Sequence, residues 1–301
     1  MKKLFLSTFL LVSATIVLVS CSQQGTEGSA VRSVQMDIPD EYKVGGMAVG
    51  LQAYTFNRFS LMEAIEKTAS TGGKVIELYP GQRLSPDSDE RFNHFASDEM
   101  IDRVKAKLDE HGILAVNYGV VNLQDEEESR QVFEFAKKMG VQAVTSEPSM
   151  DAMDRLEELV KEFDVMLAIH NHPPRANNPD YRVWDPQYVR SMVEGRDPRL
   201  GASADVGHWI RSDIAPVDGL KILEGRIISL HMADVDQFGR EGEDVIHGYG
   251  VGNMGAVLDE LRRQNFGGHI SIEYETNWDH NVPDVAQNIG FIRGWVTSWD
   301  H

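Results

Sequence analysis

The chain alternates short apolar runs with amphipathic segments from about Met47 onward. Within the amphipathic segments, apolar residues recur at positions i, i+3 and i+4, as at Leu61, Ala64 and Ile65, which is the spacing of a helix with one buried face. This alternation predicts parallel strands covered by helices. The predicted strands are Val49–Thr55, Val75–Tyr79, Leu114–Tyr118, Ala143–Ser146, Val165–Ile169, Gly201–Ala204, Ile227–Leu230 and His269–Ile272.

Eight such units follow one another without an internal linker, which favours a closed (β/α)8 TIM barrel as a single domain over residues 47–301. Glycines stand where predicted helices would end, at Gly72, Gly112 and Gly140. An open, doubly wound sheet is the alternative, but no GxGxxG motif follows the first strand. The long connections 80–97, 171–185 and 235–253 all follow strands, so they would lie on the face where barrel enzymes build their active sites.

The N-terminal segment has the pattern of an export signal. Lys2 and Lys3 precede an uncharged apolar run, and residues 1–20 are therefore predicted to be a signal peptide. The run ends at Leu18 to Cys21, which resembles the lipobox of bacterial lipoproteins, with Cys21 as the lipidated residue. Residues 21–46 would then form a flexible tether. The alternatives are an ordinary secretory signal with a stray cysteine, or an uncleaved anchor.

These features predict a protein of the bacterial cell envelope, lipid-anchored on the periplasmic side. Cys21 is the only cysteine, so no disulfide within the chain can form. The formal net charge of −18 opposes binding to nucleic acid phosphates, and no block of Lys and Arg is present. The membrane is expected as a partner through the lipid anchor only, and a homo-oligomer remains open.

Four predicted strands carry a metal-type ligand at or just beyond their ends: Glu147, Asp205, His231 and Glu273. Side chains at the strand ends of a closed barrel converge on its axis, where three carboxylates would repel one another without a cation. Three oxygen donors and one nitrogen suit Mn²⁺ first, or Mg²⁺, with Co²⁺, Fe²⁺ or Zn²⁺ as further candidates. Taken singly, each residue could instead be a salt-bridge partner, a helix cap or a core histidine.

The chain resembles the xylose isomerase-like TIM-barrel superfamily, and in particular its sugar (phosphate) isomerase/epimerase branch. The segments that carry the resemblance are 50–54, Glu147-Pro148, 205–208, 230–234 and 272–275. The resemblance implies that Glu147, Asp205, His231 and Glu273 bind the metal ion. It also implies that His208 contacts substrate or metal. Glu273 is preferred to Glu275 because it lies nearer the strand.

Strand five departs from the family pattern, because it ends in His170, Asn171 and His172. By alternation the two histidines share one face, which predicts a polar pocket with both as substrate-binding candidates. The alternative is a pair of histidines bonded to neighbouring loops. Three tryptophans could stack on a sugar ring or pack the barrel rim, with Trp209 chosen as a substrate-binding residue. They are Trp184, Trp209 and Trp278.

The resemblance implies catalysis by two carboxylates. Glu147 and Glu273, on opposite sides of the ring, would remove and return a proton next to a carbonyl while the metal stabilises the enediolate. Return of the proton to the same carbon gives an epimer, and return to the neighbouring carbon gives an isomer. Loss of a β-oxygen leaving group gives elimination.

The predicted function is a metal-dependent isomerase or epimerase acting on a keto-sugar. The alternative is a 3-keto-glycoside lyase that uses the same site, and a non-catalytic sugar-binding lipoprotein ranks below both. An exported enzyme would take an unphosphorylated small sugar or a glycoside. The glycine-rich segment 247–253 could hold a phosphate, but a tight turn is the favoured interpretation.

Overall fold

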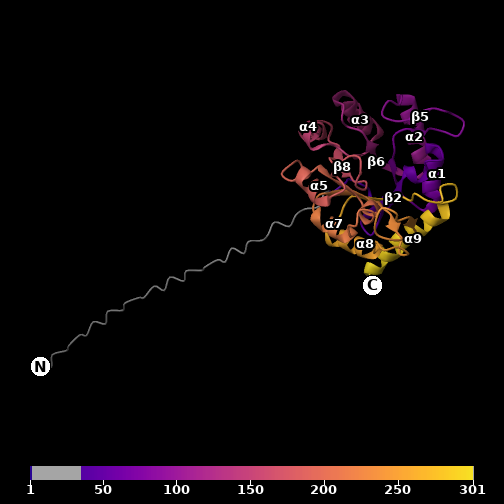
Figure 1. The fold of residues 1–301 in the computed structure, drawn as a ribbon. Helices are drawn as coiled ribbons and strands as arrows, with labels where there is room; N and C mark the ends of the chain where they lie inside the picture. The colour runs from indigo at the N-terminus through magenta and orange to yellow at the C-terminus, as the bar shows by residue number, and fades with distance from the viewer. Residues whose placement is uncertain (2–34, 301) are drawn as a thin grey trace. The chain divides into compact units, whose positions relative to one another are not determined.

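Eight parallel strands close into a barrel in the computed structural model, which describes Met1 and residues 35–300 (Figure 1). The strands follow the order β2-β13-β10-β9-β8-β7-β6-β3, and a further pairing of β2 with β3 closes the ring. The prediction of a (β/α)8 barrel is confirmed. The barrel strands are β2 (Met47–Gln52), β3 (Val75–Leu78), β6 (Leu114–Val121), β7 (Ala143–Ser146), β8 (Met166–His170), β9 (Leu200–Asp205), β10 (Ile227–Met232) and β13 (His269–Ile272).

Each predicted strand overlaps an observed strand, and the differences lie at the ends. Strand β2 ends at Gln52, three residues before the predicted end at Thr55. The reason is local, because the Gln52 side chain accepts a hydrogen bond from the Tyr54 N–H at 3.2 Å and caps a 3-10 turn over Ala53–Phe56. That turn brings Tyr54 to the C-terminal face of the barrel.

Helices surround the strands, as Figure 1 shows. Helix α1 illustrates how the sequence sets their limits. Ser60 and Glu63 form a capping box at its start, and Gly72 ends it with a φ of 87°, a left-handed conformation that favours glycine. The helices are α1 (Leu61–Thr71), α2 (Asp98–His111), α3 (Glu126–Met139), α4 (Met153–Phe163), α5 (Pro186–Val193), α6 (Val206–Ile210), α7 (Pro216–Ile222), α8 (Met254–Arg263) and α9 (Val282–Thr297).

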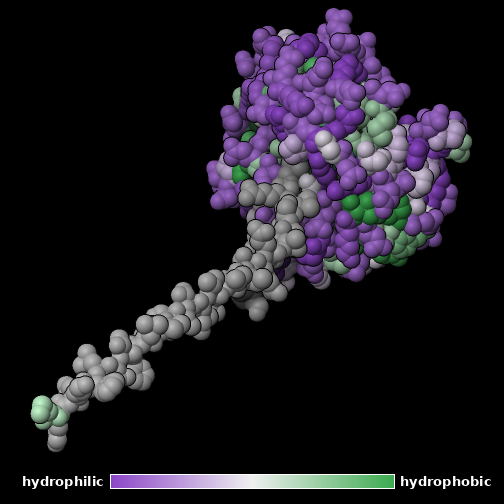
Figure 2. Space-filling view, turned by 90° about the vertical axis from the view of Figure 1, so that its left-hand side faces the viewer, coloured by the Kyte–Doolittle hydropathy of each residue, from purple (hydrophilic) through white to green (hydrophobic). Residues whose placement is uncertain are grey.

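Two of the long connections that follow strands contain small hairpins. The connection after β3 pairs β4 (Gln82–Arg83) with β5 (Arg91–Phe92), and the connection after β10 pairs β11 (Asp234–Val235) with β12 (Asp244–Val245). The face seen in Figure 2 is mostly hydrophilic, as the acidic composition suggests. Within the described residues, no helix combines the length and hydropathy needed to cross a membrane.

The segment just before the barrel packs against the barrel rather than forming part of a tether. Met36 and Ile38 are 5% and 3% exposed, and β1 (Lys43–Val44) pairs antiparallel with β2. Both side chains join an apolar cluster at the N-terminal mouth of the barrel, formed with Ala48, Val75, Val116, Ala143, Ala168 and Ile228. The predicted tether over 21–46 is therefore too long, because apolar residues from position 36 close the barrel floor. The predicted signal peptide (Met1 aside), Cys21 and the tether up to residue 34 lie outside the described residues.

Replacing Ile38 with alanine should lower the free energy of unfolding by about 2–5 kcal/mol, because it removes a buried side chain from that floor. Urea denaturation measures the loss. Val251→Ala is the control, since Val251 is 40% exposed and its truncation should cost less than about 0.5 kcal/mol. Equal midpoints for both variants would show that the segment contributes nothing to the folded body.

Candidate metal centre and active site

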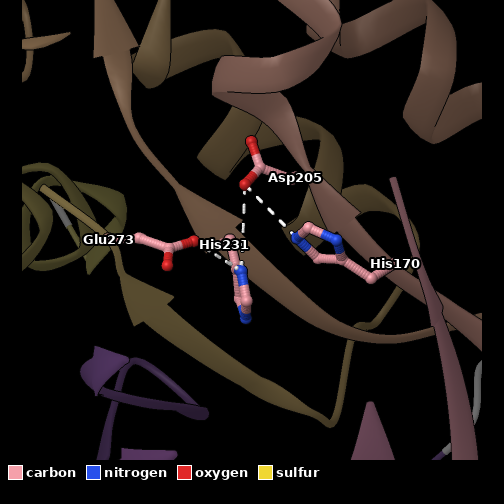
Figure 3. A group of neighbouring side chains, drawn as sticks. All are labelled: His170, Asp205, His231 and Glu273. Atoms are coloured by element: carbon pink, nitrogen blue, oxygen red, sulfur yellow. Dashed lines mark ion pairs between the residues drawn. The ribbon is translucent and has the colours of Figure 1, made fainter. Parts of the chain in front are cut away.

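Four side chains from neighbouring strands converge at the C-terminal end of the barrel: His170, Asp205, His231 and Glu273 (Figure 3). One ligand atom from each lies within 4.8 Å of the others. Asp205 Oδ2 is 3.5 Å from His170 Nε2 and 3.8 Å from His231 Nδ1. Glu273 Oε2 is 2.8 Å from His231 Nδ1. Two imidazoles and two carboxylates thus surround one point.

The polar atoms that face this point fit a divalent cation. Among the described residues, His170 Nε2 and His231 Nδ1 are buried and make no hydrogen bond, although carboxylate oxygens lie close to both. A buried ring nitrogen without a partner is costly unless an ion takes its lone pair. With neutral histidines, Asp205 and Glu273 give the group a charge of about −2, which a divalent ion balances.

Each histidine of the cluster is held through its other ring nitrogen by a carboxylate. His231 Nε2 lies 2.9 Å from Glu77 Oε2, and both side chains are fully buried. His170 Nδ1 lies 3.3 Å from Glu147 Oε1. A carboxylate on the far nitrogen fixes the tautomer and directs the near nitrogen toward a metal ion. The sequence analysis missed Glu77. Its signal in the sequence was a carboxylate inside the otherwise apolar strand β3, which indicates a buried polar partner.

Glu147 does not lie where the sequence analysis expected it. It is absent from the four-residue cluster, and His170 from the next strand takes the expected position. Its Oε1 accepts a hydrogen bond from the Tyr181 hydroxyl at 2.7 Å and contacts His172 Nδ1, while its Oε2 pairs with Arg175 Nη2 at 2.8 Å. The role of Glu147 as metal ligand and proton-transfer base therefore stays a prediction, and in this structure both its oxygens contact side chains of the loop after β8.

Glu147 also belongs to a second group, with His170 and His172, whose ligand atoms lie close enough for an ion. Here, however, hydrogen bonds satisfy the atoms. Burial disfavours the charged carboxylate, but hydrogen bonds with His170 and His172 outweigh it and hold the pKa of Glu147 well below its usual range. Arg175 balances its charge. The four-residue cluster, whose inward ring nitrogens make no hydrogen bond, is therefore the stronger candidate for an ion site.

Asn171 has a different task from the histidines on either side of it. Its side-chain amide donates to the Asp205 carbonyl at 3.0 Å, and its oxygen accepts from the Asp205 N–H at 2.9 Å. Asp205 in turn accepts the His208 N–H on Oδ1 at 2.6 Å, which starts helix α6 and leaves Oδ2 directed at the cluster. Asn171 therefore fixes the position of a candidate ligand.

A pocket of about 380 Å³ lies over the cluster. His170, His172, His208 and Glu273 line it, so these four site candidates come together there. The other residues that line the pocket are Gln52, Tyr54, Tyr79, Pro80, Gly119, Val120 and Glu275. Its size and its mixture of rings and polar groups fit a small polar ligand.

Aromatic rings form one rim of this pocket, but Trp209 is not among them. Trp209 is 1% exposed and packs helix α6 on α7, where a Cβ at Gly219 would lie 2.7 Å from its ring. The expectation that Trp209 contacts substrate is wrong for this reason. Tyr54 and Tyr79 form the rim instead, and their ring centroids lie 5.2 Å apart. The ring centroid of Trp278 lies 5.9 Å from that of Tyr54.

Glu275 shares the pocket with Glu273 without belonging to the cluster. Its backbone N–H donates to Asp244 Oδ2 at 2.7 Å. Burial and the neighbouring carboxylates of Glu273 and Asp244 raise the pKa of Glu275 to about 8. The pocket therefore holds a carboxyl that can donate a proton at neutral pH in the metal-free protein. The preference for Glu273 as ligand agrees with this arrangement.

The glycine-rich segment 247–253 is a tight turn around a side chain of the protein itself. The Asp234 carboxylate accepts the N–H groups of Gly248, Gly250 and Gly252 at 2.8, 3.1 and 3.0 Å. Asp234 is fully buried, so these amides are already occupied by an anion. The turn leaves no cradle for a phosphate, as the favoured interpretation expected.

The chain belongs to the xylose isomerase-like TIM barrel family, whose sequence pattern matches residues 65–295. It is similar to an uncharacterized protein from Parabacteroides distasonis ATCC 8503 at 32% identity, over 83% of this chain and 99% of that chain, with a TM-score of 0.68.

Two more distant structures show the same fold. A D-tagatose 3-epimerase-like protein is 18% identical over 84% of this chain and 98% of its own, with a TM-score of 0.65. The IOLI protein with a bound zinc atom is 17% identical over 83% and 98%, with a TM-score of 0.60. No curated protein matches the chain.

Glu77→Gln should weaken metal binding about 10- to 100-fold while leaving all four cluster residues in place, because an amide holds the His231 tautomer less firmly than a carboxylate does. Competition with a chromogenic chelator measures the affinity. Glu260→Gln is the matched control, since Glu260 is also buried but is bonded to Arg263 on helix α8. Unchanged affinity in Glu77→Gln would contradict the assigned role of Glu77.

Proposed function

We propose that this protein is a divalent-metal-dependent enzyme that moves a proton next to the carbonyl group of a keto-sugar. The observation that carries the proposal is the buried cluster of two histidines and two carboxylates, whose inward ring nitrogens lack hydrogen-bond partners at the floor of a pocket. Its aromatic rim, formed by Tyr54 and Tyr79, supplies ring faces of the kind that stack on sugars.

His170, Asp205, His231 and Glu273 would hold the ion, which when bound draws electron density from a carbonyl oxygen and offsets the charge that develops there. The replacement of Glu147 by His170 changes the donor set from one nitrogen and three oxygens to two of each. Imidazole donors favour Fe²⁺ or Zn²⁺ over Mg²⁺, while the two carboxylates still suit Mn²⁺. The zinc atom bound by the IOLI protein, which has the same fold, supports this choice.

Proton transfer is assigned to Glu273 and His172, which both line the pocket. His172 uses Nδ1 for its contact with Glu147, which leaves Nε2 available to a ligand. Glu147 is not assigned this role in the proposal, because Tyr181 and Arg175 contact its oxygens. A base within reach of the acidic carbon and an acid on the opposite side are what epimerisation requires. The likeness to a D-tagatose 3-epimerase-like protein supports the same class of reaction.

The second candidate is a lyase acting on a 3-keto-glycoside. Both candidates begin with the same proton abstraction, and they differ in whether the proton returns or a glycosidic oxygen leaves. The observation that favours the lyase is that a second cavity adjoins the pocket, with Val120 lining both. A bound glycoside would have room for its leaving group there.

Solvent deuterium exchange tests the function. The full chain, loaded with Mn²⁺, is incubated in D2O with a panel of ketohexoses and 3-keto-glucosides and followed by NMR. We expect deuterium at the carbon next to the carbonyl, with either an isomeric sugar or a released alcohol as product. Sugar binding without exchange for any member of the panel would identify a non-catalytic sugar-binding protein and reject the enzyme.

We also propose that Cys21 carries a lipid that anchors the protein in the cell envelope, where unphosphorylated sugars and glycosides are available. The sequence from Leu18 to Cys21 motivates this proposal. Mass spectrometry of the mature chain should find an acylated N-terminal Cys21, and Cys21→Ser should release the protein from membranes. A mature chain that begins elsewhere and carries no lipid would contradict it.

A further inference from the structure

The active-site pocket is the first of three adjoining cavities. Val120 lines both the pocket and a second cavity of about 300 Å³. Gln124, Glu147 and Arg175 line both that cavity and a third one of about 610 Å³. The shared residues make the three cavities neighbours, and Arg175 lines the second and the third of them. The third, here called the outer cavity, is larger than the pocket itself.

Arg175 lines both the second cavity and the outer cavity, and two contacts hold its side chain in place. Its guanidinium pairs with Glu147 Oε2 at 2.8 Å and lies 3.9 Å from the centroid of the Tyr181 ring. Because Glu147 balances the charge of Arg175, a ligand that contacts Arg175 does not have to be an anion. Its side chain is still 44% exposed, so donors remain for the oxygen atoms of a ligand.

The lining of the outer cavity suits a neutral sugar or a similar polar ring. Tyr181 and Tyr188 contribute rings, and the Arg182 guanidinium lies 4.3 Å from the Tyr188 ring centroid. Asp151 and Asp180 add carboxylates to the same lining. These carboxylates, together with the net charge of −18, oppose an anionic ligand. Rings combined with hydrogen-bonding side chains are the pattern of carbohydrate binding.

We propose that the substrate is a two-part molecule, in which the reacting sugar lies over the metal centre and a second neutral ring, a sugar or an aglycone, occupies the outer cavity. This inference rests on the proposed function for its first part. A free monosaccharide would fill the pocket alone and leave Arg175, Tyr181 and Tyr188 without a role in recognition.

Isothermal titration of the Mn²⁺-loaded full chain tests the inference without turnover. The probes are glucose and five neutral disaccharides: cellobiose, maltose, trehalose, lactose and sucrose. We expect at least one disaccharide to bind about tenfold more tightly than glucose. Tyr188→Ala and Arg182→Ala should abolish that preference and leave the affinity for glucose unchanged. Arg182 is exposed, so its loss does not threaten folding.

Tyr249→Ala is the matched control, because Tyr249 is 81% exposed and lines none of the three cavities. It should keep the full preference. If every disaccharide binds no better than glucose, or if the preference survives both cavity variants, the inference is overturned. Proton exchange on a ketohexose would then still support the proposed function, whereas disaccharide preference without any proton exchange would reject the function and retain the second binding site.

Discussion

Replacing His231 with alanine should empty the metal centre and also weaken the fold. The variant loses one of the four candidate ligands, so metal content measured by inductively coupled plasma mass spectrometry should fall from about one ion per chain to almost none. Activity should fall by more than the roughly 100-fold cost of losing an outer partner of a ligand. In addition, Glu77 would remain fully buried with the Ser271 hydroxyl still bonded to it but without its imidazole partner, and breaking a buried pair in this way costs about 3–5 kcal/mol.

The two effects separate experimentally. Urea denaturation of the metal-free wild type and of metal-free His231→Ala compares stability without any contribution from the ion. His94→Ala is the control, because His94 is a mostly buried histidine whose Nε2 lies 3.1 Å from a carboxylate oxygen of Glu128, outside the cluster. It should retain the metal. A His231→Ala protein with full metal content, or full activity of the wild type after exhaustive chelation, would remove the basis for a metal enzyme.

Much of this site could be predicted because the C-terminal ends of all eight barrel strands lie on the same face of the barrel. Asp205 ends β9, His231 is the penultimate residue of β10, and Glu273 follows β13, so the strand pattern alone brings the three together. The alternation of side chains along β8 likewise placed His170 and His172 on one face of the barrel end. These inferences needed only the period of the strand.

The position of Glu147 outside the four-residue cluster has a non-local cause. A residue one position past a strand can face the barrel axis or the rim, and strand periodicity does not decide between them. Here Arg175 and Tyr181, from the loop after the next strand, bind both carboxylate oxygens. Loop conformation over such a separation cannot be deduced from local pattern. The burial of Trp209 is a similar case, because it depends on the approach of Gly219 from another helix.

Glu77 and Met36 differ, because the sequence did carry a signal for each. A glutamate inside a strand that is buried along its whole length must have a buried partner, so Glu77 marked a polar network in the core. Met36 and Ile38 alternate with polar residues in a segment otherwise short of apolar side chains, which indicates one buried face. The composition of the preceding residues obscured that short pattern.

Glu273→Gln should slow proton exchange by roughly 10²–10⁴, which is the usual cost of losing a general base. The amide keeps the size of the side chain and one oxygen that can still face the metal, but it cannot accept the proton. Part of the loss could come from weaker metal binding, so occupancy is measured in the same sample and the rate is expressed per bound ion. Exchange is followed by NMR as deuterium enters the carbon next to the carbonyl.

Glu275→Gln is the matched comparison, because Glu275 lines the same pocket two residues further along and is not part of the cluster. It should keep its metal and exchange the proton at a rate much closer to that of the wild type. If Glu273→Gln retains the ion and exchanges at the wild-type rate, the base is a different group, and His172→Gln is the next variant to measure. The product distinguishes the two candidate functions in the same tube: an isomeric sugar supports the isomerase or epimerase, and a released alcohol supports the lyase, because only elimination breaks the bond to the leaving group.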